Sequence, residues 1–164
     1  MTDDARRVLD DYEAMSDAYA DAADREPVQV AYERPAILAM AGEVRGRRVL
    51  DAGCAAGALA EALVERGAEV VGLDLNPRFI ERARARLGRS ATFHVADISA
   101  PMPRLATGTF DIAIASLVLH YLRDWGPPLR EFARILRPGG LLLISTHHPT
   151  KDMVLADPKA GYFE

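Results

Sequence analysis

Five apolar segments alternate with helix-like patterns along most of this chain, and this alternation constrains its fold more than any other feature. The segments read, in chain order, RRVLDAG, AEVVGLD, ATFHVAD, FDIAIASLVL and LLLISTHH. Near-continuous apolar strands separated by helices are typical of a parallel sheet that is covered on both faces. Because crossovers between parallel strands are right-handed, the alternation predicts an α/β fold with a doubly wound parallel sheet.

Helix signals fall between the predicted strands. Asn76 followed by Pro77 is a capping residue with proline at the first helical position, and Gly88 follows the apolar-periodic segment that begins there. Pro35 can open a shorter helix before the first strand. A helix through Leu136 is expected between the fourth and fifth strands.

The segment before Pro35 predicts further helical structure. Val8, Tyr12, Met15 and Tyr19 recur three or four positions apart, as residues on one face of a helix do. One interpretation of this stripe is core contact, and the alternative is a lid. The lid residues are Tyr12, Tyr19 and Tyr32. The expected parts of the chain are an N-terminal helical cap over 1–44, a ligand-binding core over 45–149, and the start of an incomplete C-terminal region over 150–164.

Composition excludes several classes of protein. A chain of 164 residues with 49% hydrophobic residues is long enough for one domain with a sizeable core. Its net charge of −4 disfavours nucleic-acid binding. The single cysteine, Cys54, forms no internal disulfide, which favours a reducing, cytoplasmic compartment. We expect no membrane span, because no apolar run approaches the roughly 20 residues that a span needs.

Polar residues gather where the predicted strands end. Asp51, Asp74 and Asp97 lie at the ends of the first three strands, Ser116 lies near the end of the fourth, and His147 near the end of the fifth. In doubly wound sheets, ligands bind outside the carboxyl ends of the strands. The pattern therefore predicts a binding site at this edge.

A glycine-bearing turn follows the first strand. Gly53 lets the chain turn sharply and lets backbone approach a ligand, and Gly57 lies where the next helix packs closely. The start of that helix offers free N–H groups. Asp74, 21 positions after Gly53, can accept hydrogen bonds from two ribose hydroxyls. These features are shared with dinucleotide-binding proteins.

Two features favour a different ligand. The dinucleotide pattern G-x-G-x-x-G is broken here, because Ala55 stands two positions after Gly53. Asp51 would also repel a pyrophosphate, whereas it suits a ligand with positive charge near the strand end. S-adenosylmethionine is such a ligand, since it carries an ammonium, a sulfonium and no phosphate.

The sequence resembles the class I S-adenosylmethionine-dependent methyltransferases, and within them the type 11 group that acts mostly on small molecules. Five motifs carry the resemblance in order over residues 45–149: VLDAGCAAGALAEAL, VVGLDLNP, FHVADIS, FDIAIASLVLHYL and LRPGGLLLIS. The flanking YERPAILAM and HHP segments resemble one bacterial branch. The resemblance implies a Rossmann-like sheet of strand order 3-2-1-4-5, and a transferase whose product is S-adenosylhomocysteine.

The resemblance also implies roles for residues at the strand ends. Asp51 holds the methionine ammonium, Asp74 accepts from the ribose hydroxyls, and Asp97 accepts from the adenine amino group. Ser116 and Leu117 lie under the sulfonium. The other implied cofactor residues are Gly53, Cys54, Gly57, Leu75, Asn76 and Ile98. No metal site is expected.

Each of these residues has an alternative structural role. Asp51 could cap the following helix, Asp74 could simply end its strand, and Asp97 could close a turn with Ser99. Cys54 is expected to be a small buried residue rather than a nucleophile. The arginine-rich segment 78–89 is interpreted as a solvated helix face with interleaved glutamate.

The methyl acceptor is the least determined part. His120 and His147 are candidate general bases, because histidine titrates near neutral pH and both follow predicted strands. For each, a structural histidine is the alternative, and His94 inside a strand is expected to be structural. No Asn/Asp-Pro-Pro-Tyr signature follows the fourth strand, which favours a small-molecule acceptor over nucleic acid.

Two departures from the family bear on function. Ala55 stands where the family usually has glycine, at a cost of about 1 kcal/mol if that position needs positive φ. The sequence also lacks the family's final antiparallel hairpin, so the fifth strand is expected at an open sheet edge that invites self-association. Two alternatives therefore remain: a non-catalytic S-adenosylmethionine-binding domain or fragment, and an NAD-dependent oxidoreductase.

Overall fold

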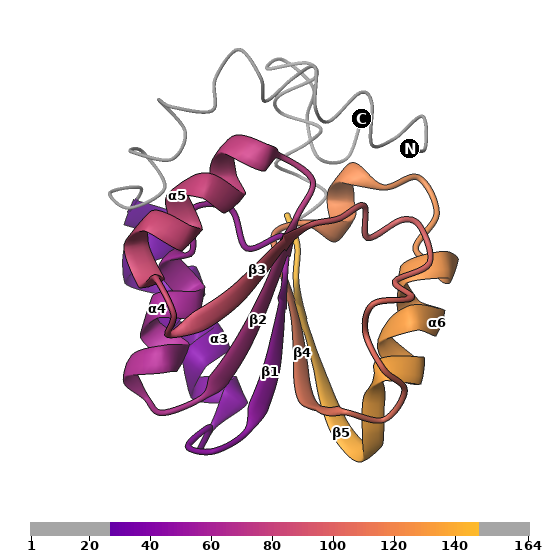
Figure 1. Ribbon diagram of the computed structural model, residues 1–164, viewed down its shortest axis with the longest axis horizontal. Coiled ribbons are helices and arrows are strands. Elements are labelled where there is room, and N and C mark those ends of the chain that lie inside the picture. Colours follow the sequence, from indigo (N-terminus) through magenta and orange to yellow (C-terminus); the bar gives the residue numbers. More distant parts are fainter. Residues whose placement is uncertain (1–26, 148–164) are drawn as a thin grey trace, which may run out of the picture.

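The structure, a computed structural model, describes residues 27–147 (Figure 1). It begins with two consecutive helical segments, η1 (Gln29–Glu33) and α3 (Arg34–Ala41). The predicted stripe from Val8 to Tyr19 and the region 150–164 lie outside the described residues. Among the described residues, no helix is both long and apolar enough to cross a membrane.

Five parallel strands form one sheet. They are β1 (Arg48–Ala52), β2 (Glu69–Asp74), β3 (Ala91–Val95), β4 (Phe110–Ser116) and β5 (Leu136–Ser145). Their order is β3-β2-β1-β4-β5, which confirms the predicted 3-2-1-4-5 order (Figure 1). The expected position of β5 at a sheet edge is also confirmed.

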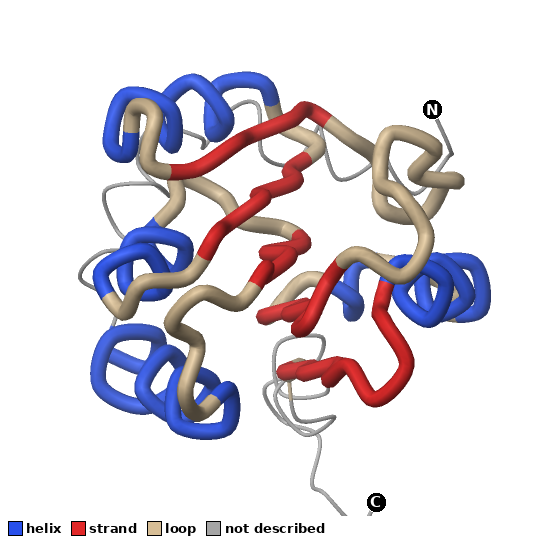
Figure 2. Tube along the Cα trace, turned by 60° about the horizontal axis from the view of Figure 1, so that its bottom comes forward, coloured by secondary structure: helices blue, strands red, loops and turns tan. Residues whose placement is uncertain are grey.

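Helices cover both faces of this sheet. In Figure 1, α3, α4 (Ala58–Glu65) and α5 (Pro77–Leu87) lie on one face, and α6 (Gly126–Ile135) lies on the other. Figure 2 shows the strands as the middle layer between these helices. The three layers are those expected of a Rossmann-like fold.

The sheet separates the two larger apolar clusters of the core. Val49 belongs to the cluster under α3, α4 and α5, and the next residue, Leu50, belongs to the cluster under α6. Successive side chains of a strand point to opposite faces, and both β1 faces are covered, so both residues are fully buried. This explains why two successive residues of β1 are apolar instead of alternating with polar ones.

The fourth predicted strand is too long. β4 ends at Ser116 rather than Leu119, because Leu117 adopts a left-handed φ of +48°. The chain then forms the short 3-10 helix η2 (Leu119–Tyr121). Leu119 is fully buried in the cluster under α6. Its apolar character therefore reflects tertiary packing and not strand pairing.

The fifth predicted strand, over 141–148, begins and ends too late, because β5 ends at Ser145. β5 begins at Leu136, which was expected in a helix, because the backbone there is already extended at φ −70° and ψ 137°. Phe110 pairs with Leu136 but Ile112 pairs with Leu141, so the intervening residues form an irregular bulge. Pro138 is tolerated there because an edge strand leaves one side unpaired.

Candidate cofactor site

Asp51 is a buried carboxyl without a hydrogen-bond partner. It is 0% exposed, and neither of its carboxyl oxygens is bonded to any other part of the described chain. Burial raises the pKa of this carboxyl from 3.8 to about 7. The negative charges of Asp74 and Glu33 contribute to this rise in pKa, and the positive charge of Arg34 opposes it. An unpartnered buried carboxyl is destabilising, so its presence at a strand end suits a cationic ligand.

The capping alternative for Asp51 does not fit the structure. The following helix, α4, begins after Gly57, and no side chain caps it. The position of the Asp51 carboxyl is therefore set by β1, where Asp51 pairs with Gly72 of β2 and Ile114 of β4. The neighbouring strands hold the carboxyl at the centre of the sheet.

The turn after β1 needs its glycines. Gly53 has φ +80°, and a Cβ atom there would lie 2.6 Å from Val118 Cγ2. Gly57 has φ +84°, and a Cβ atom there would lie 3.2 Å from Ala83 Cβ. Ala55 between them has φ +45°, so the position where the family usually has glycine does take a left-handed backbone. The turn therefore holds a strained alanine.

Asp74 holds the same turn in place. Its Oδ2 accepts a 2.9 Å hydrogen bond from the Ala55 amide, and its Oδ1 accepts a 2.8 Å bond from the Asn76 amide. Burial raises the pKa of Asp74 to about 6, and the hydrogen bonds from Asn76 and Ala55 oppose the rise. Because a carboxylate has about four acceptor positions, Asp74 retains capacity for ribose hydroxyls.

Residues after β2 and β3 line the same edge. Asn76 Oδ1 accepts from the Arg78 amide at 2.9 Å, which confirms Asn76 as the cap of α5. Asp97 Oδ1 accepts from the Ser99 amide at 2.9 Å and from Ser99 Oγ at 2.5 Å. Asp97 therefore closes a turn with Ser99, the structural alternative that the sequence offered. Ile98 beside it is buried.

Glu33 lies against the strand ends, and sequence reasoning missed it. Its Oε1 accepts hydrogen bonds from Ser116 Oγ at 2.7 Å and from Ser145 Oγ at 2.6 Å. The sequence signal was an acidic and a basic residue, Glu33 and Arg34, side by side at the start of an otherwise apolar helix. Only the fold brings that helix to the ends of β4 and β5.

His120 and His147 come together in the structure. His120 lies in η2 and His147 follows β5, and their rings stack with centroids 4.1 Å apart and planes inclined by 21°. His120 also contacts the Tyr121 ring at 4.2 Å. His148, the neighbouring residue, lies outside the described range. Two strand ends thus supply one histidine pair.

The structure also describes Cys54 and one tyrosine of the expected lid. Cys54 is buried, and burial raises the pKa of its thiol well above the ordinary 9.0, which disfavours a nucleophilic role. Tyr32 of the expected lid is 76% exposed on η1, while Tyr12 and Tyr19 are not described. Within residues 27–147, no group of three or more potential ligands could hold a metal ion.

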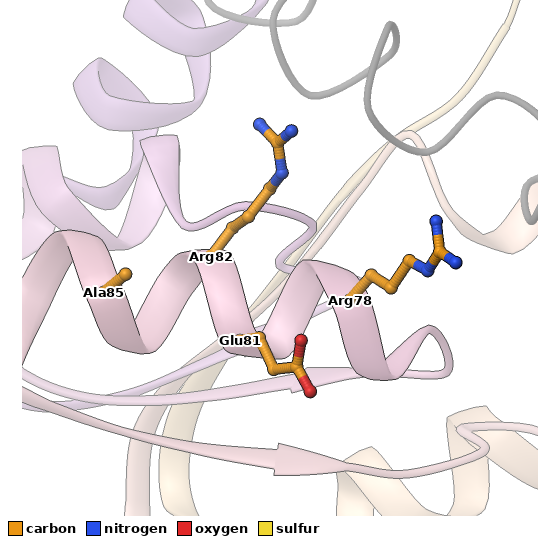
Figure 3. A pocket seen from close by; sticks show the side chains of 4 residues that line it. All are labelled: Arg78, Glu81, Arg82 and Ala85. Atoms are coloured by element: carbon orange, nitrogen blue, oxygen red, sulfur yellow. The ribbon is translucent and has the colours of Figure 1, made fainter.

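A surface hollow of about 410 Å³ lies apart from these residues. Arg78, Glu81, Arg82 and Ala85 line it, all from α5 (Figure 3). Figure 3 shows the two arginine side chains extending from the helix on one side and Glu81 on another. None of the predicted cofactor residues lines this hollow, and one helix face does not make an enclosed site.

Known proteins are similar to this chain in sequence. A family model described as "Methyltransferase domain" matches residues 50–144. The ubiquinone biosynthesis O-methyltransferase of Bordetella avium is 36% identical over 110 residues, covering 65% of this chain and 45% of that protein. The malonyl-[acyl-carrier protein] O-methyltransferase of Serratia marcescens is 35% identical over 140 residues, covering 82% of this chain and 52% of that protein. The chain therefore spans about half the length of these relatives.

A solved structure is also similar to this chain. The crystal structure of an S-adenosylmethionine-dependent methyltransferase from Mesorhizobium loti has a TM-score of 0.66 and 39% identity, covering 70% of this chain and 52% of that one. The family match covers more than half of the 164 residues, and it begins and ends within the strands that build the site. The chain belongs to the class I S-adenosylmethionine-dependent methyltransferases.

Proposed function

We propose that this chain binds S-adenosylmethionine and forms the cofactor-binding part of an enzyme that methylates a small molecule. The observation that carries the proposal is the buried Asp51 carboxyl, whose oxygens have no partner within residues 27–147. A ligand ammonium would supply both the missing charge and the missing donors. A pyrophosphate would instead bring negative charge toward Asp51, which disfavours NAD.

The remaining cofactor residues surround Asp51 along the strand ends. Asp74 is proposed to accept from the ribose hydroxyls while it keeps the Ala55 amide. Asp97 and the Ile98 amide are proposed to meet adenine. The backbone and small side chains proposed to complete the site are those of Gly53, Cys54, Gly57, Leu75, Asn76, Ser116 and Leu117.

Methyl transfer requires the protein mainly to align the acceptor with the methyl group and the leaving sulfur. When bound, S-adenosylmethionine supplies a methyl group that is already activated on a sulfonium. Ser116 and Leu117 would fix the cofactor relative to the acceptor, and the surrounding residues would exclude water. A hydroxyl acceptor must also lose a proton, and His120 or His147 is the proposed base. Relatives named O-methyltransferases support an oxygen acceptor.

The proposal extends to partners and location. A net charge of −4 supports a small-molecule acceptor rather than nucleic acid, and the single cysteine supports a cytoplasmic location. Self-association is proposed through the β5 edge, where Leu141 is 41% exposed. The cap over 1–44, the core over 45–149 and the start of a further region over 150–164 remain the proposed domain plan.

A second candidate is cofactor binding without turnover. The chain spans about half of the relatives it matches, and the proposed cofactor residues all lie before Val118. The acceptor side can therefore depend on sequence beyond this chain, while cofactor binding does not.

Calorimetric titration tests the proposal. S-adenosylmethionine and NAD would each be titrated into the chain at pH 7.5, and S-adenosylmethionine into the Asp51→Asn variant. We expect binding of S-adenosylmethionine but not NAD, and a loss of about tenfold or more in the variant, which keeps the shape but not the charge. Binding of NAD alone would refute the proposal.

A further inference from the structure

Glu33 joins the helical segment before β1 to the ends of two strands. One carboxylate oxygen, Oε1, accepts from both Ser116 Oγ and Ser145 Oγ. These serines are the last residues of β4 and β5 and face each other in the sheet register. Hydrogen bonds to a charged acceptor are stronger than those between neutral groups. The strand ends are therefore fixed to each other and to η1 through a single side chain.

The connection continues into the turn after β4. The Leu117 amide donates to Ser145 Oγ at 3.1 Å and to the Ser145 carbonyl oxygen at 3.1 Å. Leu117 has a φ of +48°, a left-handed conformation that a leucine rarely adopts. Such conformations persist where surrounding contacts enforce them, and they cluster at functional sites. Ser145, held by Glu33, supplies those contacts here.

This turn packs directly against the glycine turn of the cofactor site. Val118 follows Leu117, and its Cγ2 lies 2.6 Å from the place where a Cβ of Gly53 would stand. No side chain fits between the two turns. A change in the Leu117 backbone would therefore move Val118 relative to Gly53, which is the residue that approaches the cofactor.

We propose that Glu33 is a positioning residue of the methyl-transfer site, because it fixes the Leu117–Val118 turn through Ser145 and so sets the position of that turn against Gly53. The inference rests on the proposed function and adds a residue to it. Glu33 acts through other groups and is not proposed to react. The effect of Glu33 on the turn depends on where its acceptor oxygen lies. Glutamine at this position should therefore retain most of that effect.

The test compares Glu33→Ala with Glu33→Gln in two measurements. Hydrogen exchange of the Leu117 amide, followed by NMR, reports whether the turn is held. Calorimetry with S-adenosylmethionine reports whether fixing the Leu117 turn affects cofactor affinity. Glu33→Ala should accelerate Leu117 exchange and weaken binding about tenfold, because the turn loses the acceptor that holds Ser116 and Ser145 in place. Glu33→Gln should stay within about threefold of the unchanged protein in affinity, since an amide oxygen can accept from both serines.

Two further variants complete the design. Ser145→Ala removes the hydroxyl that joins Glu33 to the Leu117 amide, while the Ser145 carbonyl oxygen still accepts from that amide. It should reproduce the effect of Glu33→Ala on both measurements, which keeps the test valid if Glu33→Ala does not fold. Glu65→Ala, at an exposed position at the end of α4, makes the same charge change away from the site and should alter neither measurement.

The outcomes separate this inference from the proposed function. If the unchanged chain does not bind S-adenosylmethionine, the proposed function fails and the inference fails with it. If the chain binds but Glu33→Ala and Ser145→Ala bind equally well, with only lower melting temperatures, Glu33 is merely structural and the inference alone is overturned. Equal losses in Glu33→Gln and Glu33→Ala would also overturn it, because charge rather than positioning would then be responsible.

Discussion

The Ala55 amide donates a 2.9 Å hydrogen bond to Asp74 Oδ2, so the carboxylate at the end of β2 holds the turn that follows β1. Ala55 has a left-handed backbone, with φ +45°. The bond therefore links the strained residue of the turn to the carboxylate proposed to bind the ribose. Substitution of Asp74 should affect both the ligand and the turn.

Asp74→Ala should weaken S-adenosylmethionine binding by about 2–3 kcal/mol, because it removes charge-assisted hydrogen bonds to two hydroxyls. Calorimetry on the folded variant measures the loss. Circular dichroism establishes that the variant is folded. An unchanged affinity would contradict the ribose role.

Asp97→Ala should cost less, about 1–2 kcal/mol of binding free energy, because adenine also depends on backbone contacts and stacking. The matched control is Ser99→Ala, which removes the hydroxyl bonded to Asp97 Oδ1 but keeps the carboxylate. A loss in Ser99→Ala as large as that in Asp97→Ala would show that the turn, and not an adenine contact, accounts for the effect.

The Asp51 carboxyl should make the empty protein less stable as pH rises. Its pKa is raised from 3.8 to about 7, so the folded state binds more protons than the unfolded state between these values. The free energy of unfolding should therefore fall with rising pH across this window, by at most about 1.4 kcal/mol per pH unit from this group.

Urea unfolding of the chain and of Asp51→Asn between pH 4 and pH 8 measures this contribution. The difference in unfolding free energy between the two proteins cancels groups that titrate independently of Asp51, and it retains the coupling of Asp51 to Asp74 and Glu33. The variant should gain stability relative to the unchanged chain as pH rises toward 7. A difference that does not vary with pH would mean that Asp51 ionises normally.

Ala55→Gly should stabilise the protein slightly. Removing the left-handed strain gains about 1–2 kcal/mol, which exceeds by a small margin the roughly 1 kcal/mol lost to the greater flexibility of the unfolded chain. Ala62→Gly, inside α4, should instead lose about 1 kcal/mol of helix stability. Urea unfolding compares the two variants, and a destabilised Ala55→Gly protein would contradict the strain at this position.

At least one of the variants His120→Gln and His147→Gln should lower methyl transfer by about 10²-fold or more, measured in a form of the protein that shows turnover, because one of the pair is the proposed base. Cofactor affinity should stay unchanged in both. The measurement is turnover as a function of pH with a hydroxyl acceptor. Full turnover in both variants would leave the stacked pair with a structural role.

Leu141→Lys should reduce self-association, because a charge on an edge strand opposes pairing with another sheet. Met40→Lys is the matched control, since Met40 is 62% exposed on α3 and away from the edge. Sedimentation at several concentrations compares the two with the unchanged chain. Equal association in all three proteins would rule out the β5 edge as the contact.

The sequence by itself determined the order of strands and helices, the Asn76 cap, and the placement of Asp51, Asp74 and Asp97 at one edge of the sheet. These features depend on local patterns: apolar runs, capping residues, and the rule that parallel strands end at the same edge. The sequence left open whether Ala55 takes a left-handed backbone, and the structure decides it with a φ of +45°.

Only the tertiary structure decided where β4 stops and what holds its end. Leu117 and Leu119 read as strand residues, but the bonds from Leu117 to Ser145 and the burial of Leu119 under α6 override that pattern. Glu33 and Ser145 are 112 positions apart in sequence, and no local signal links them. Their contact arises because helical and strand packing places η1 beside the ends of β4 and β5, which is a property of the assembled fold.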